Sequence, residues 1–211
     1  VSRGRLFTFI YAVWAGAAIS IGGTAYLSLD NKIAGALFFS VGLFTIVTMG
    51  LNLFTGKVCY VFERDVSFAV DLPVIWLGNL AGAWLTAALI RTTRIAAPLV
   101  EKAAGLCEAK LGDGLVSIFI LAVFCNLLIF IAVDNFGANK HDVGKYIALF
   151  MGVAVFILCG FEHCVANMFY FSLAGVWSGK TLVYLLVMTL GNAVGGWILP
   201  VSRQLKGKYL K

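Results

Sequence analysis

Two short polar stretches interrupt long apolar segments of the sequence and carry residue types that can do chemistry. Residues 50–57 contain Thr55, and residues 160–167 contain Glu162 and His163. Polar groups deep in an apolar segment are energetically costly, so they are candidates for function. A threonine hydroxyl and an imidazole N–H both donate hydrogen bonds, and histidine is the side chain that changes charge near neutral pH. We therefore predict a polar site centred on Thr55 and His163.

Structural roles are open for the same residues. Thr55 can bond a carbonyl of its own helix, and a lone buried histidine is often a purely structural group. Glu162 needs a partner, for which Lys110 is a candidate, and Lys57 is expected to extend towards a polar interface. Asparagines in these segments can simply tie neighbouring helices together.

The composition indicates which elements position these residues. The chain of 211 residues is 61% hydrophobic and 12% charged, and a soluble domain has about twice that charged fraction. A soluble fold of this size could not bury so much apolar surface, so we predict an integral membrane protein with lipid around it. The sequence has six apolar segments of about spanning length. They comprise residues 6–29, 34–62, 71–90, 114–133, 144–172 and 180–202.

The net charge of +6 does not indicate nucleic-acid binding. The basic residues lie at the ends of the apolar segments and in the C-terminal tail, as the positive-inside rule and anionic lipid require. The stretch from Leu6 to Leu29 is too long for a signal peptide and is expected to be a mature span. Because the sequence starts with Val1 and not methionine, we expect that a preceding segment is missing.

A repeat relates the two halves of the chain. Leu, Gly, Asn, Gly and Trp occur in the same order at residues 77–84 and 113 residues later at 190–197. Each half has three predicted spans, so the second copy must enter the membrane from the opposite side. We predict one channel domain over residues 1–211, with inverted repeats at about 1–90 and 114–203 and an interfacial linker at 91–113.

The repeat also predicts where a solute would cross. Inverted-repeat transporters place their sites near the midplane, where interrupted helices meet. The second and fifth spans are long, are expected to be broken and contain the two polar stretches. A broken span exposes N–H groups and a positive dipole end, which would favour an anion. The basic residues favour the side that holds both termini by ten to six, which predicts that both termini are cytoplasmic.

Other classes of protein fit the sequence less well. Its five cysteines contain no CxxC pair, so neither a disulfide nor a zinc site is expected. We predict no metal, no cofactor and no catalytic residues, because an enzyme would need paired carboxylates, a nucleophile with its base, or metal ligands. A water or glycerol channel would carry Asn-Pro-Ala at each break, and none of the three prolines lies at a break. A purely structural scaffold would leave both polar stretches unexplained.

The motifs Leu-Phe-Thr-Gly at 53–56 and Gly-Phe-Glu-His-Cys-Val-Ala-Asn-Met at 160–168 closely resemble the signatures of the formate/nitrite transporter family. The resemblance covers nearly the whole chain. It implies an aquaporin-like, all-α fold of six transmembrane helices with a broken second and fifth helix. It also implies a homopentamer in the cytoplasmic (inner) membrane, with one pore per protomer. The implied substrates are small monovalent anions or their acids, including formate, nitrite and hydrosulfide.

The resemblance also implies roles for individual residues. His163 resembles the family's central pore histidine, and Thr55 resembles its neighbouring hydroxyl. Leu53 and Phe156 resemble one hydrophobic constriction, and Phe39 and Leu43 resemble the other. The residues that match a supporting polar network are Lys110, Glu162, Asn126, Asn167 and Asn192.

Two departures from the family pattern bear on the substrate. Lys57 stands where a neutral amide is expected, and Asp134-Asn135 replaces an apolar end of the fourth span. We take them as a weak indication of the hydrosulfide branch. The alternatives that stay open are a proton-coupled transporter of small weak acids and an aquaporin-like channel for neutral solutes.

Overall fold

The computed structural model describes residues 3–209, and this part of the chain is helical without any β-strand. The predicted domain limits at residues 1 and 211, and the tail residue Lys211, lie outside the described residues. The helices are α1 (Arg3–Ser28), α2 (Lys32–Phe39), α3 (Val41–Met49), α4 (Phe54–Lys57), the 3-10 helix η1 (Val58–Tyr60), α5 (Val66–Arg91), α6 (Ala96–Gly112), α7 (Leu115–Ala138), α8 (Asp142–Leu158), α9 (Cys164–Ala174) and α10 (Gly179–Tyr209).

Several helices have the length and composition of membrane spans. Helices α1 and α5 each contain 26 residues, which gives about 39 Å of helix against the roughly 30 Å of a hydrocarbon core. Among residues 3–209, five stretches of helix are long and apolar enough to cross a membrane. Large apolar side chains on their outer faces, such as Trp14 and Val66, are mostly exposed. Lipid is the environment in which this exposure is not costly.

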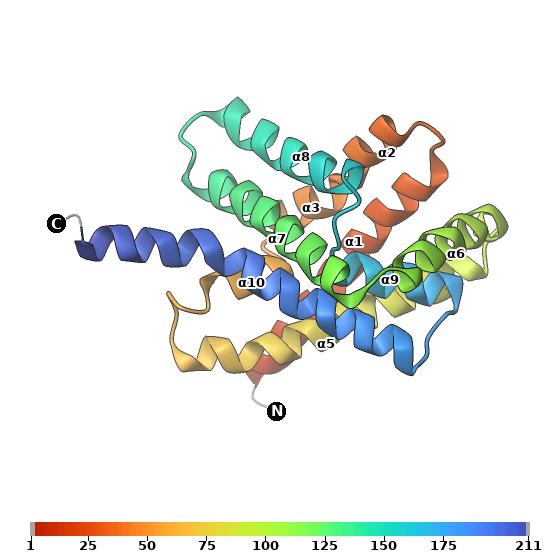
Figure 1. Ribbon diagram of the computed structural model, residues 1–211, viewed down its shortest axis with the longest axis horizontal. Coiled ribbons are helices and arrows are strands. Elements are labelled where there is room, and N and C mark those ends of the chain that lie inside the picture. Colours follow the sequence, from red (N-terminus) through yellow and green to blue (C-terminus); the bar gives the residue numbers. More distant parts are fainter. Residues whose placement is uncertain (1–2, 210–211) are drawn as a thin grey trace.

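Glycines allow the long helices to pack in two close pairs, α1 with α5 and α7 with α10. Figure 1 shows α10 running alongside α7 across the width of the molecule. A side chain at Gly82 of α5 would collide with the carbonyl oxygen of Val13, and one at Gly195 of α10 with that of Val123. Small residues at such contacts let two backbones approach closely in lipid, where packing is the main source of helix association.

We expect Gly195→Ala to destabilise the protein, because its Cβ would meet the Val123 backbone, which cannot move aside as a flexible side chain can. The expected loss is about 1–3 kcal/mol, measured as a lower unfolding temperature in detergent. Gly105→Ala in α6 is the matched control, since a Cβ there meets nothing within 4 Å. This control should be neutral or up to about 1 kcal/mol more stable. Equal effects of the two substitutions would contradict the packing argument.

The two long apolar segments each contain a non-helical stretch. Helix α3 ends at Gly50, which has a left-handed φ of 65°, and α4 begins only at Phe54. Helix α8 ends at Leu158, and α9 begins at Cys164. The intervening Gly160 has a φ of 68°, a conformation that glycine adopts without strain.

The segment at 91–113 forms helix α6, which packs against α9. It buries Leu99, Ala103 and Cys107, which follow one another at four-residue spacing on one face. Glu101 and Lys102 are exposed. Helix α6 therefore covers the side of α9 and brings Lys110 to the second polar stretch.

Candidate functional site

The start of α4 is held by a buried asparagine of α5. The backbone N–H of Phe54 donates to the side-chain oxygen of Asn79 at 2.8 Å. The amide nitrogen of Asn79 donates to the carbonyls of Ala12 (2.8 Å) and Asn52 (2.9 Å). One side chain thus joins α1, the non-helical stretch and α4. Asn79 was not among the predicted site residues, although the repeat pairs it with Asn192.

The start of α9 is held in the same way by Asn192 of α10. The N–H of Cys164 donates to the side-chain oxygen of Asn192 at 2.8 Å. The amide nitrogen of Asn192 donates to the carbonyls of Ala122 and Glu162, each at 2.8 Å. Asn192 is fully buried. Two of its bonds satisfy the Cys164 N–H and the Glu162 carbonyl, which have no partner within a helix, and the third goes to the Ala122 carbonyl inside α7.

His163 is fixed by a hydrogen bond at each ring nitrogen. It is the residue before α9, and its Nδ1 accepts the N–H of Ala166 at 3.1 Å, which caps that helix. Its Nε2 lies 2.9 Å from the Thr55 hydroxyl oxygen. Because Nδ1 accepts a hydrogen bond, the proton of the neutral ring is on Nε2, which then donates to Thr55. A proton on Nδ1 would face another donor, so the cap favours the neutral ring.

A buried ion pair lies beside the histidine. Lys110 Nζ donates to a carboxylate oxygen of Glu162 at 2.7 Å, and only 15% and 4% of the two side chains are exposed. Asn167 donates to the same oxygen at 2.7 Å and to the His163 carbonyl at 3.1 Å. The lysine supplies the charge that a buried carboxylate requires. Lys110 reaches this position from α6, as the sequence suggested.

The remaining predicted polar residue closes the network. Asn126 of α7 donates to the carbonyls of Asn192 (2.7 Å) and Thr55 (3.0 Å). All seven polar residues predicted for the site therefore belong to one connected network. Thr55 and His163 bond to each other, Lys110 and Asn167 bond to the Glu162 carboxylate, and Asn126 and Asn192 bond to the surrounding backbone.

The apolar residues predicted for the site contact either the histidine or a cavity beside it. The ring of Phe156 stacks on His163 with centroids 5.7 Å apart, and Phe39 meets Phe156 edge to face at 5.8 Å. Leu53 and Leu43 line a separate cavity of about 290 Å³. The expected pairs, Phe156 with Leu53 and Phe39 with Leu43, stay a prediction. Phe39 ends α2 and packs against α8, a contact that spacing along the chain does not reveal.

Metal ligands do not gather at this network. In the described part of the chain, no three His, Cys, Asp or Glu residues lie together in a way that could hold a metal ion. Thr55 and His163 supply hydrogen-bonding groups in a mostly apolar setting.

Comparison with known proteins identifies the family. The model of the formate/nitrite transporter family matches residues 2–202. The chain belongs to the formate/nitrite transporter family. It is therefore an integral membrane protein of a channel and transporter family, which confirms the family resemblance drawn from the motifs and the prediction of a membrane protein.

Named relatives and solved structures agree with this assignment. The chain is 31% identical over 183 residues to the uncharacterized transporter YrhG of Bacillus subtilis (strain 168), covering 79% of this chain and 68% of YrhG. It is 24% identical to the formate channel FocB of Escherichia coli (strain K12), covering 100% of this chain and 90% of FocB. A solved pentameric formate channel with formate bound matches with a TM-score of 0.85 and 26% identity, covering 100% of both chains. A solved FNT family ion channel has the same fold, with a TM-score of 0.77 and 23% identity, over 96% of this chain and 89% of that one.

Proposed function

We propose that this chain is a channel, and not an enzyme, that conducts small monovalent anions across the cell membrane. The observation that carries the proposal is the hydrogen bond between Thr55 in α4 and His163, the residue before α9, with Phe156 stacked on the histidine. Formate is the first candidate substrate because two of the matched proteins are named formate channels. Nitrite and hydrosulfide are the other candidates.

The proposed architecture is a six-span inverted repeat of residues 1–90 and 114–203, joined by the linker 91–113. Helices α2 to α4 would make the broken second span, and α8 with α9 the broken fifth. The matched hydrogen bonds of Asn79 and Asn192 support it, since the two asparagines occupy one position of the repeat. Trp76 donates to Thr189 at 3.1 Å, and these residues are also 113 positions apart. Equivalent residues of two halves can contact each other only near the axis that relates them.

In this proposal the anion is bound by side chains rather than by helix ends. The N–H groups of Phe54, Cys164 and Ala166 are already donated to Asn79, Asn192 and His163. The helix dipoles still favour negative charge, but the hydrogen bond to the solute would come from the hydroxyl of Thr55, which accepts the ring N–H of His163. The donation from His163 polarises the Thr55 hydroxyl and strengthens its own donation.

The apolar groups would set selectivity. An isolated charge pays a large desolvation penalty between Phe39 and Phe156, and again at Leu43 and Leu53. Only a small anion that receives hydrogen bonds between these barriers, or that takes up a proton, crosses at a useful rate. Because the cap holds His163 neutral, we infer that it acts as a hydrogen-bond donor and not as the source of the proton.

The proposed assembly is a homopentamer in the cytoplasmic membrane with both termini in the cytoplasm. The matched pentameric formate channel supports the oligomeric state. An apolar groove between α1 and α3, lined by Trp14, Val41 and Met49, offers a surface that a neighbouring protomer or lipid would cover.

The direct test is anion flux into proteoliposomes. We expect wild-type protein to conduct formate, and Thr55→Ser to conduct it within about threefold of wild type because a hydroxyl is retained. Thr55→Val, which has nearly the same volume, should lose about tenfold or more, since a hydrogen bond to a charged group contributes about 1.5–3 kcal/mol. Nitrite and hydrosulfide are measured in parallel to rank the substrates, and osmotic shrinkage tests a neutral-solute channel. Water or glycerol flux without anion flux would overturn the proposal.

A further inference from the structure

The charged residues that line the cavity next to Leu53 are all basic. Its volume is about 290 Å³, and its wall includes Leu43, Leu53, Tyr60 and the two basic residues Lys57 and Arg64. No acidic side chain lines it, and the other lining residues are apolar or glycine. Two cations thus share one cavity whose wall also contains a residue of the proposed barrier.

Both cations are available to a ligand. Within residues 3–209, neither Lys57 nor Arg64 forms an ion pair or a side-chain hydrogen bond. The nearby Asp134 does not line the cavity and is bound to Arg203 at 2.6 Å. Lys57 is partly buried, so its charge faces a restricted volume, whereas Arg64 is exposed. Two like charges that line one cavity favour an anion that neutralises them.

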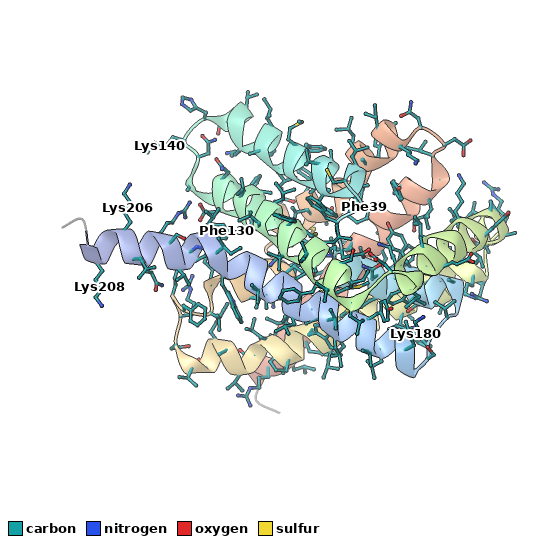
Figure 2. All side chains as sticks on the ribbon, viewed as in Figure 1. Phe39, Phe130, Lys140, Lys180, Lys206 and Lys208 are labelled. Atoms are coloured by element: carbon teal, nitrogen blue, oxygen red, sulfur yellow. The ribbon has the colours of Figure 1, made fainter. Side chains whose placement is uncertain are left out.

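The cavity lies towards one end of the molecule, which determines the side of the membrane it would face. Arg64 follows η1 closely, and the side chain of Gln204 near the C-terminal end of α10 donates to the nearby Phe62 carbonyl. The cavity therefore opens at the end of the molecule that carries Lys206 and Lys208, on the left of Figure 2. Lys110, the lysine beside the histidine, is already paired with Glu162.

We propose that Lys57 and Arg64 form an anion-binding site that loads the channel from this side and that is blocked by divalent anions. This inference rests on the proposed function and extends it to a specific site and ligand class. A monovalent anion bound there can go on past Leu53 as described above. A dianion matches the two cations better but carries twice the charge into the apolar barrier. It stays in the cavity and excludes the permeant anion.

The test uses sulfate, which keeps two charges at neutral pH, on wild-type protein in planar bilayers. Formate current is recorded at constant ionic strength, maintained with gluconate, while sulfate is added to each chamber in turn. We expect sulfate to inhibit from one chamber only and to compete with formate. The double variant Lys57→Gln and Arg64→Gln should need at least about tenfold more sulfate for half-inhibition. Lys140→Gln is the matched control, because Lys140 is exposed at the same end of the molecule but does not line the cavity (Figure 2), and its sensitivity should equal that of wild type.

Two outcomes overturn the inference while formate current is present. One is wild-type current that sulfate does not inhibit from either side, and the other is inhibition that the double variant leaves unchanged. If wild-type protein carries no formate current, the proposed function fails, and binding is judged separately in detergent. There, sulfate should raise the unfolding temperature of wild type and of Lys140→Gln but not of the double variant. An equal rise in all three would show that sulfate binds elsewhere.

Discussion

His163→Phe is expected to lower formate flux about tenfold to a hundredfold. The substitution keeps an aromatic ring next to Phe156 but removes both ring nitrogens. Thr55 loses the donor at 2.9 Å, and the solute loses a polarised hydrogen bond in an apolar setting. A barrier raised by about 2.7 kcal/mol lowers a rate about a hundredfold. The measurement is initial formate influx into proteoliposomes at matched protein content.

His163→Asn separates the fold from the function of this residue. Asparagine is a favoured N-cap, so it can still accept the Ala166 N–H, but its shorter side chain does not extend to Thr55. We expect His163→Asn to have near wild-type thermal stability and low formate flux. His163→Phe should have both lower thermal stability and low formate flux. The pH dependence of the remaining flux should match that of wild type, because the cap keeps the ring neutral. A loss of the wild-type pH response in His163→Asn would instead favour proton transfer by the histidine, and unchanged flux in both variants would remove it from the mechanism.

The membrane class and the family could be read from the sequence because both depend on local signals. Apolar length, charge at segment ends and the span-five motif are properties of neighbouring residues. The exact helix limits were harder to predict from the sequence. The segment predicted at 34–62 contains three α-helices and one 3-10 helix, because Ser40 joins α2 to α3 and Gly50 ends α3.

The composition of the polar network was predictable, but its bonds were not. Glu162 requires a cation, and few are available near it in sequence, which made Lys110 a candidate across 52 positions. The tautomer of His163 depends on the N–H of Ala166, which is free only because α9 begins at the next residue after the histidine. The pairing of Phe39 with Phe156 depends on how α2 lies against α8. Such contacts between distant segments are set by the packing of whole helices.

Asn192→Ala is expected to cause a large loss of stability. It leaves the Cys164 N–H and the Glu162 carbonyl unpaired beside a fully buried position, and it removes the additional bond to the Ala122 carbonyl inside α7. Each buried group left unpaired costs about 1–3 kcal/mol. A total of at least about 3 kcal/mol would lower the unfolding temperature by about 6–12 °C. The measurement is thermal unfolding of the purified protein in detergent.

The repeat makes this prediction sharper, because Asn79→Ala breaks the corresponding three bonds at the start of α4 and should cost a similar amount. Asn31→Ala is the control for a simple cap. The Asn31 side chain bonds only the N–H of Ala34 at an exposed position, so this substitution should cost about 1 kcal/mol.

Asn192→Asp keeps the acceptor for Cys164 and loses both donors, so its loss of stability should be close to that of Asn192→Ala, with an added cost for burying charge. If Asn192→Ala is no worse than Asn31→Ala, the start of α9 does not depend on this asparagine. In that case the position of His163 would have to be explained by its own cap and by the stacking on Phe156.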